Sequence, residues 1–335
     1  MNPEEETKDD RDIAQLLRGV GPRSDPPEDI TQSVRLAVEA QWHAVVARRA
    51  GKRKLVGWSL AAAAALIAIG AWVYFPSPRP KGDRVAEVSA TIGSLTANSG
   101  SWGRWQPVHL HEAVRTGQKL ATDPEGRAAL ALPGNVSLRL DRDTRIAVLD
   151  SRHFTIERGA VYVDAGSDLI PDAERLQIVT PAGAVRHVGT QYEVRLVDSG
   201  VRIAVREGKI ELDASSGTAQ LAVAGEQMMV SASGTVERRS LSRDDASWRW
   251  VITAAPAFDI EGRPLAQLLT WAARELGRDV VYATPQSEAE ASQVLLSGSI
   301  SGLSPTEALA AVLPTTPLKV EDRGGRLVVS LSRAP

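Results

Sequence analysis

The spacing of hydrophobic positions changes several times along the chain. Residues 1–54 contain short helical patterns, and residues 55–75 form one uninterrupted apolar run. Apolar and polar residues alternate in short runs over residues 84–250, and residues 256–333 mix helix and strand patterns. Alternation is typical of strands, whereas a spacing of three to four is typical of helices. We therefore expect a mainly β domain, solenoid- or sandwich-like, followed by a small α+β domain.

The apolar run Leu55–Phe75 contains no charged residue. As a helix it reaches about 30 Å, the thickness of a bilayer core. Trp58 lies near one end, and Trp72 and Tyr74 lie near the other, where aromatic side chains meet the membrane surface. The run predicts a single transmembrane helix, with a buried helix of a soluble protein as the alternative.

Charges on either side of this run predict its orientation. Basic residues are dense just before it, at Arg48, Arg49, Lys52, Arg53 and Lys54, and sparser after it, at Arg79, Lys81 and Arg84. Cytoplasmic flanks carry the excess of positive charge. We expect a single-pass protein of a bacterial inner membrane, with residues 1–54 cytoplasmic, a linker over 76–83 and the rest periplasmic.

The cytoplasmic segment is too short to bury a core of its own easily. Its two predicted helices carry apolar stripes, and Asp25 followed by Pro26 marks the start of the second. We expect a partner to bind the stripes through Leu16, Leu17, Val34, Val38 and Trp42. A helix lying on the membrane surface is the alternative.

The middle of the chain reads as many short strands. Val136–Leu140 and Tyr192–Val197 alternate apolar and polar residues, and turn residues such as Pro133–Asn135 separate such runs. Strands repeating every 8–12 residues or so are typical of an all-β sandwich, barrel or solenoid.

Several stretches of this region carry a family resemblance. They are LATDPEGRAAL at 120–130, RGAVYV at 158–163, VRHVGTQYEV at 185–194 and VREGKIEL at 205–212. In this order they resemble FecR-type domains, and the resemblance covers residues 84–250. The shared residues Gly126, Arg127, Gly159, Gly189, Thr190 and Gly208 are expected to be structural. For the glycines we expect positive φ angles or close backbone approaches at turns.

FecR-type proteins are single-pass inner-membrane regulators that relay a periplasmic signal to an extracytoplasmic-function sigma factor. The resemblance therefore implies a sigma factor as the cytoplasmic partner. It also implies a TonB-dependent outer-membrane receptor, or another periplasmic protein, as the partner on the far side.

The C-terminal region predicts alternating strands and helices. We expect strands at 258–260, 279–283 and 294–300, helices after Pro264 and Ser304, and a hairpin of 318–322 and 326–330. The stretches FDI at 258–260, ELG at 275–277 and LSPTEAL at 303–309 resemble secretin/TonB short N-terminal domains, and this resemblance covers residues 256–333. It implies a surface for protein docking.

Composition excludes several kinds of chemistry. The chain has no cysteine, so disulfides, Cys-ligated zinc and a Cys nucleophile are excluded. A net charge of −2 gives no overall reason to bind nucleic acid. His109 and His111 could share one face of a strand, but two histidines are too few for a metal site. No catalytic motif occurs, so we expect no enzyme activity, no cofactor and no metal.

Two other functions remain open beside a FecR-like regulator. The periplasmic part could be an envelope-anchored binding module that docks glycan or an outer-membrane complex. Trp102 and Trp105 could stack on such a ligand, although a role in the core or at a strand edge fits them better. An envelope hydrolase is the third possibility.

Overall fold

The computed structural model describes Gln32 and residues 82–100, 103–166, 175–214 and 217–332. Apart from Gln32, which is helical and exposed, all of these belong to the compact unit Pro80–Pro335; the other unit is Met1–Arg79. No helix among the described residues is long and apolar enough to cross a membrane. The predicted membrane helix at 55–75 lies outside them, as does nearly all of the cytoplasmic segment.

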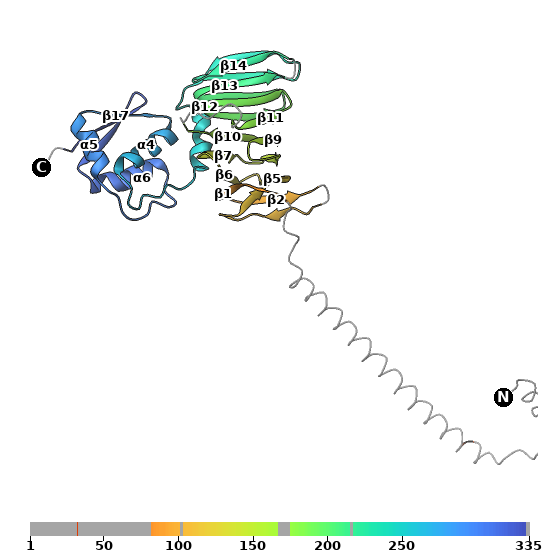
Figure 1. Ribbon diagram of the computed structural model, residues 1–335, viewed down its shortest axis with the longest axis horizontal. Coiled ribbons are helices and arrows are strands. Elements are labelled where there is room, and N and C mark those ends of the chain that lie inside the picture. Colours follow the sequence, from red (N-terminus) through yellow and green to blue (C-terminus); the bar gives the residue numbers. More distant parts are fainter. Residues whose placement is uncertain (1–31, 33–81, 101–102, 167–174, 215–216, 333–335) are drawn as a thin grey trace, which may run out of the picture. The chain divides into compact units, whose positions relative to one another are not determined.

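Residues 84–240 form one sheet of sixteen strands, so the prediction of a mainly β domain is confirmed. The strands are β1 (Arg84–Ile92), β2 (Leu95–Ser99), β3 (Gln106–Pro107), β4 (Ala113–Arg115), β5 (Gln118–Thr122), β6 (Arg127–Leu132), β7 (Val136–Leu140), β8 (Arg145–Val148), β9 (His153–Arg158), β10 (Ala160–Asp164), β11 (Gln177–Thr180), β12 (Gly183–Val197), β13 (Gly200–Ala214), β14 (Ala219–Val223), β15 (Glu226–Ser231) and β16 (Val236–Ser240). Figure 1 shows them stacked from β1 and β2 to β14.

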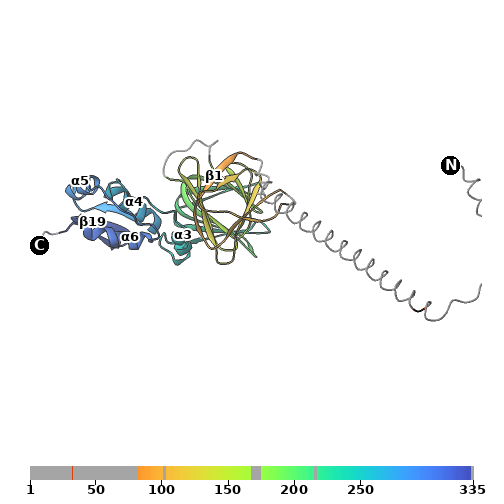
Figure 2. The ribbon, with the colours of Figure 1, turned by 90° about the horizontal axis from the view of Figure 1, so that it is seen from below.

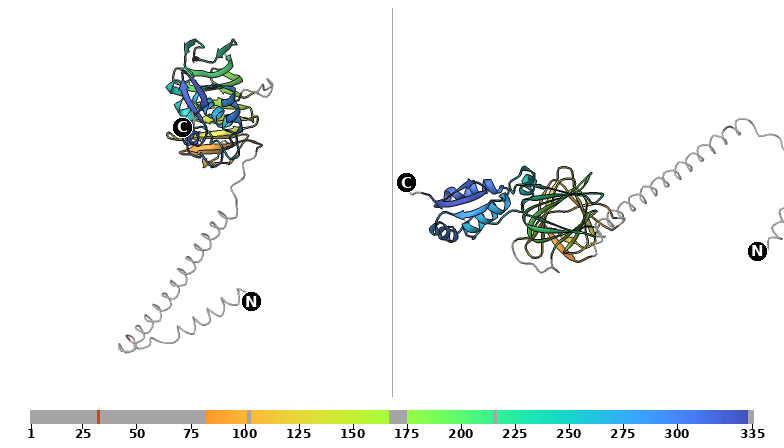
Figure 3. Two further views of the ribbon diagram at one scale, coloured as in Figure 1. Left: turned by 90° about the vertical axis from the view of Figure 1, so that its left-hand side faces the viewer. Right: turned by 90° about the horizontal axis from the view of Figure 1, so that it is seen from above.

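The sheet curls because each of its two longest strands, β12 and β13, pairs with two different strands along one of its edges. The first half of β12 pairs with β11 and the second half with β10, and β13 pairs with β12 along its length. Two arms follow from this, β11-β9-β8-β5-β2 and β10-β7-β6-β1. Both arms contribute to one hydrophobic core, and the end-on views in Figures 2 and 3 show the strands surrounding it.

The chain crosses between the arms at tight corners. β1 runs into β2 at Gly93, β5 into β6 at residues 123–126, β7 into β8 at residues 141–144, and β9 into β10 at Gly159. Backbone hydrogen bonds join successive corners: Asp123 N donates to Ser94 O at 3.2 Å, and Asp143 N donates to Asp123 O at 2.9 Å. The corners therefore stack along one side of the sheet.

Strand β10 is buried along its whole length. β9 alternates, since its inner residues Phe154 and Ile156 are buried, whereas all five residues of β10 are buried. A strand buried on both faces must be covered on its outer face as well. The cover comes from the short helices η2 (Ala246–Trp248) and α3 (Arg249–Thr253), whose tryptophans pack on Tyr162.

The C-terminal module has its own core. Its elements are α4 (Leu265–Leu276), β17 (Asp279–Tyr282), α5 (Pro285–Gln293), α6 (Pro305–Val312), η3 (Leu313–Thr315), β18 (Leu318–Arg323) and β19 (Arg326–Leu331). The strands form a sheet of order β17-β19-β18. Pro264 precedes α4, Gly277 ends it with φ +67°, and Ser304 and Glu307 form the predicted capping box of α6.

Two predictions for this module are wrong, and one helix was missed. Residues 258–260 form no strand, and residues 294–300 form none either, apart from one isolated bridge between Leu295 and Pro264. In that segment Leu296 and Ile300 are buried while Leu295 is 68% exposed, so it covers the core as an irregular loop. Helix α5 was not predicted, because its polar sequence has little apolar periodicity.

Candidate functional site

The predicted partner-binding residues Leu16, Leu17, Val34, Val38 and Trp42 lie outside the described residues. Binding through them therefore stays a prediction. The described part of the chain brings together a different group of side chains, at the joint between the β domain and the C-terminal module. The glycines of the FecR-like stretches shape the β domain around this joint.

Gly126 and Gly159 lie at the stacked corners. Gly159 has φ +83°, and a Cβ atom on it would lie 2.4 Å from Thr144 Oγ1. A Cβ on Gly126 would lie 2.7 Å from Asp123 Oδ1 and 2.8 Å from Ser94 O. Only glycine fits such close approaches without moving a neighbour.

Gly189 and Gly208 lie where β12 and β13 bend together from one arm to the other. Their φ angles are +58° and +73°, and a Cβ on Gly208 would lie 2.2 Å from Gly189 O. The pairing of β12 with β13 shifts register here, between Val188 and Gln191. Thr190 next to the bend is buried. The bend turns the second half of β12 toward the joint.

Arg127 of β6 belongs to an ion-pair network that begins on the arm β10-β7-β6-β1. Its Nε donates to Asp141 Oδ1 at 2.9 Å, and Arg195 Nη2 donates to Asp141 Oδ2 at 2.6 Å. Arg195 and Arg202 also contact Glu193, which is 1% exposed. This network therefore leads from a corner of the sheet to the outer face of β12.

Two tryptophans, Trp248 and Trp250, cover that outer face. Trp250 Nε1 donates to Glu193 Oε2 at 2.7 Å, and Trp248 Nε1 donates to Ser242 O at 2.9 Å. Both rings meet Tyr162 edge-on, with centroids 6.4 and 6.0 Å away. Burial raises the pKa of Tyr162, so its hydroxyl stays protonated at neutral pH.

A buried ion pair connects the β domain to α4. Arg139 of β7 donates two hydrogen bonds of 2.6 Å to the carboxylate of Glu275, and a third of 2.9 Å to Val251 O. Arg139 is 1% exposed and Glu275 is 4% exposed. Burial lowers the pKa of Arg139, but the charge and hydrogen bonds of Glu275 together with the charge of Asp164 outweigh burial and raise the pKa, so the guanidinium stays protonated.

A second set of ionic contacts lies beside the first. Arg274 Nε donates to Asp164 Oδ1 at 2.9 Å, Arg274 Nη1 contacts Glu207 Oε2 at 3.2 Å, and Gln191 Nε2 donates to Asp164 Oδ2 at 3.1 Å. Burial raises the pKa of Asp164, but the attraction of Arg274 prevails and holds this pKa below its usual range. Arg274 and Glu275, which are consecutive in α4, are thus held by two different strands, β10 and β7.

The end of α4 fits closely against the β domain. Arg206 Nη1 donates to Glu275 O at 3.0 Å and its Nε to Arg243 O at 2.9 Å. A Cβ on Gly277 would lie 2.4 Å from Arg243 O and 2.6 Å from Arg206 Nη2. Glycine at the end of α4 therefore serves both the left-handed cap and the joint.

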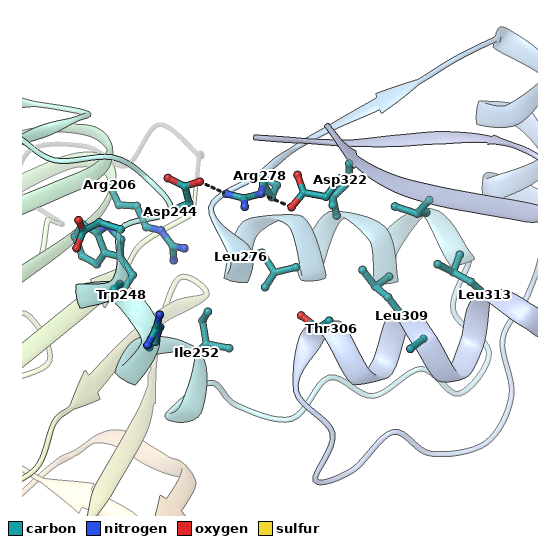
Figure 4. A pocket seen from close by; sticks show the side chains of 16 residues that line it. Arg206, Asp244, Trp248, Ile252, Leu276, Arg278, Thr306, Leu309, Leu313 and Asp322 are labelled. Atoms are coloured by element: carbon teal, nitrogen blue, oxygen red, sulfur yellow. Dashed lines mark hydrogen bonds and ion pairs between the residues drawn. The ribbon is translucent and has the colours of Figure 1, made fainter. Parts of the chain in front are cut away.

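A cavity of about 630 Å³ opens next to the joint. Its lining comes from the segment 244–252, the end of α4, α6, β18 and β19. Figure 4 shows Arg278 between two carboxylates: its Nη1 lies 3.1 Å from Asp244 Oδ2 and its Nε 3.0 Å from Asp322 Oδ2. The cavity thus combines apolar walls with a charged rim, a composition common in ligand-binding pockets.

The histidine pair predicted on a strand lies in a turn instead. Residues 109–112 connect β3 to β4, and His111 has φ +65°. His111 Nδ1 lies 3.0 Å from Glu87 Oε1, while His109 N donates to Glu112 Oε2 at 3.0 Å. Within the described ranges, no group of three metal-ligating side chains comes together.

Trp105 is 38% exposed, and the guanidinium of Arg145 lies 5.1 Å from the centre of its ring. Trp102 lies outside the described residues. Trp105 therefore occupies an exposed loop position before β3, where a cation–π contact fixes it.

Sequence reasoning missed the ion pairs of the joint. Arg139 and Glu275 are 136 residues apart, and Arg274 and Asp164 are 110 apart. No local pattern links residues at such distances. One indirect signal is the run AVYVD of β10, whose apolar residues continue on both faces.

One family model matches a part of the β domain. Residues 118–211 match the family described as FecR protein. Two crystal structures of a proposed anti-sigma factor from Parabacteroides distasonis ATCC 8503 show 15% and 14% identity, each with a TM-score of 0.35. They cover 64% and 63% of this chain, and 98% and 97% of their own. A TM-score of 0.35 is too low to support a conclusion about fold or function. No curated protein matches the chain significantly.

Proposed function

Residues 118–211 belong to the FecR family, and from this premise we propose that the chain regulates a sigma factor from a bacterial inner membrane. The regulator binds an extracytoplasmic-function sigma factor through residues 1–54. Its β domain and C-terminal module respond to a protein on the periplasmic side. The FecR match is the observation that carries this proposal.

The predicted membrane topology supports the proposal. The apolar run Leu55–Phe75 is long enough to span a bilayer, and the basic residues before it favour a cytoplasmic N-terminus. In this arrangement the stripe of Val34, Val38 and Trp42 faces the cytoplasm, where a sigma factor is found. The chain then acts by binding and not by catalysis.

The C-terminal module supplies the surface for the periplasmic partner. We propose a TonB-dependent receptor, or another periplasmic protein, as this partner, since the module resembles secretin/TonB short N-terminal domains. The ion pairs of Arg139 with Glu275 and of Arg274 with Asp164 hold the module on the β domain. A partner bound to the module can thereby act on the whole periplasmic part.

A crosslinking pull-down of the membrane-embedded full chain tests the sigma-factor partner. We expect mass spectrometry to identify a sigma factor that is lost when residues 1–50 are removed. Val38→Asp should also abolish its capture, because a carboxylate interrupts the apolar stripe. Gln32→Asp, which adds the same charge at an exposed position, should leave capture unchanged.

The opposite result would favour the envelope-docking alternative. If the full chain captures only periplasmic or outer-membrane proteins, and truncation of residues 1–50 changes nothing, regulation of a sigma factor is excluded.

A further inference from the structure

The cavity beside the joint has an apolar floor that is not fully covered. Four side chains of the floor are half-buried: Ile252 of α3, Leu276 of α4, Leu313 of η3 and Val320 of β18. They come from four separate elements, and the volume of about 630 Å³ lies within the usual range of binding sites. The floor therefore offers a concave apolar surface that spans the joint and the edge strand β18.

Three arginines and three aspartates line the cavity, so their formal charges balance. Arg278 is held by Asp244 and Asp322, and Arg206 donates to backbone carbonyls. Asp245 accepts a hydrogen bond of 2.8 Å from Ser247 N. Arg249 also lines the cavity and is exposed, and its guanidinium has no hydrogen-bond or ion-pair partner among the described residues. Arg249 is therefore the lining guanidinium left free to pair with a ligand above the apolar floor.

We infer that this cavity, called the groove below, binds a peptide segment of the periplasmic partner, one in which apolar side chains lie beside a carboxylate. The apolar side chains cover the half-buried floor, and the carboxylate pairs with Arg249. An arginine can hold a carboxylate through two parallel hydrogen bonds, which fixes the segment in one register. The inference rests on the proposed function, because it names where the regulator receives its periplasmic partner.

The groove shares residues with the joint between the β domain and the C-terminal module. Arg206 and Trp248 line it, and the same two residues belong to the joint: Arg206 donates to Glu275 O, and its guanidinium lies 5.5 Å from the centre of the Trp248 ring. A bound segment therefore touches both the β domain and the C-terminal module.

Site-specific photo-crosslinking of the full chain in cells tests the inference. The photoreactive residue p-benzoylphenylalanine replaces Ala310, an exposed residue of α6 that lines the groove, and its neighbour Ala311, which is exposed outside it, serves as the control. We expect an adduct from position 310 and none from 311. Mass spectrometry should map the adduct to a segment that contains apolar residues and an Asp or Glu.

Charge variants then test the role of Arg249. Arg249→Glu should reduce the adduct about tenfold, the effect of losing one charge-assisted contact. Arg104→Glu makes the same change on the exposed loop before β3 and should leave the yield unchanged. An adduct that resists Arg249→Glu, or that maps to a segment without a carboxylate, to glycan or to lipid, overturns the inference.

The sigma-factor pull-down distinguishes this failure from failure of the proposed function. Capture of a sigma factor through residues 1–50 without a groove adduct would overturn the inference and leave the regulator intact. Loss of both the sigma factor and the groove adduct would overturn the proposed function and the inference together.

Discussion

Single glycines decide where the sheet of the β domain can turn. At Gly159 two demands coincide, a φ angle of +83° and contact of the missing Cβ with Thr144. Thr144 Oγ1 accepts a hydrogen bond from Ala160 N at 3.0 Å and donates one to Ala160 O at 3.1 Å, so the corner cannot easily open. The sequence predicts a turn here, but not how closely the neighbouring corner approaches.

Gly159→Ala should lower the free energy of unfolding by about 2 kcal/mol or more, through left-handed strain together with the clash. Gly134→Ala is the matched control, since Gly134 has φ +76° and a methyl group on it would meet no atom within 4 Å. Urea unfolding of the full chain in detergent measures both. Equal losses of unfolding free energy in the two variants would show that close packing at Gly159 adds nothing to stability.

His187 is a second residue whose surroundings set its behaviour. It is fully buried, and Leu176 N donates to its Nε2 at 3.1 Å, which requires an unprotonated Nε2. Burial, with a smaller contribution from Arg175, lowers the pKa of His187 from 6.5 to about 4. The unfolded chain therefore binds a proton more readily than the folded chain between these two values.

The stability that neutral His187 contributes should be present above about pH 6.5 and be lost as the pH falls toward 4. At pH 4.5 the loss should reach roughly 2 to 3 kcal/mol relative to pH 7. His187→Gln keeps a hydrogen-bond acceptor but cannot titrate, so its urea midpoints should depend less on pH. His109→Gln, at an exposed position, should behave like the parent chain, and equal pH dependence of all three would contradict the argument.

At the scale of elements, the end of the sheet needs protection. β14 pairs on one side only, with β13, and its outward side chains Leu221 and Val223 are 53% and 43% exposed. Side chains satisfy part of its free edge: Arg238 Nη1 donates to Leu221 O at 2.7 Å, and Glu226 Oε2 accepts from Val223 N at 3.0 Å. An apolar edge strand without such cover pairs readily with other chains.

Arg238→Ala should therefore promote association of the full chain through β14. Light scattering coupled to size-exclusion chromatography should show dimers or larger species that grow with concentration. Arg239→Ala removes the neighbouring guanidinium, which contacts Gln227 and not β14, and should remain at the mass of the parent chain. Identical masses for both variants would show that Arg238 does not protect the edge.

Elements with strong local signals were predicted, and those defined by tertiary contacts were not. Pro264, Gly277 and the capping box at Ser304 mark their helices in the sequence, and the structure has both helices. Helix α5 begins with a capping box too, but Ser287 takes the place of the usual Glu or Gln. The apolar residues at 294–296 suggested a strand, yet their backbone bonds to Arg263, before α4, and to Leu265, in α4, and pairs with no strand of the described sheet.

At the scale of the whole molecule, the unit Pro80–Pro335 has two large cores and an ionic joint. The cores could be predicted from two stretches of sequence with different hydrophobic periods. The joint could not, because Arg139, Asp164 and Glu275 meet only after the sheet has curled and α4 has docked. Buried ion pairs contribute little net stability, but losing one partner leaves a buried charge without compensation.

Glu275→Gln should therefore uncouple the two cores. The change leaves Arg139 buried without its counter-charge and should weaken docking of α4 by about 3 to 5 kcal/mol. Calorimetry of the full chain should then show two separate unfolding transitions for the described unit, where the parent chain shows one.

Two further variants decide whether charge at the joint is responsible. Asp322→Asn removes a carboxylate from an exposed ion pair with Arg278 and should leave the single transition unchanged, because exposed pairs contribute little. The double variant Arg139→Met with Glu275→Leu removes both charges and should restore coupled unfolding. If Glu275→Gln unfolds in a single transition like its parent, α4 is held by shape at Gly277 and the tryptophans, and the ion pair is not what couples the two cores.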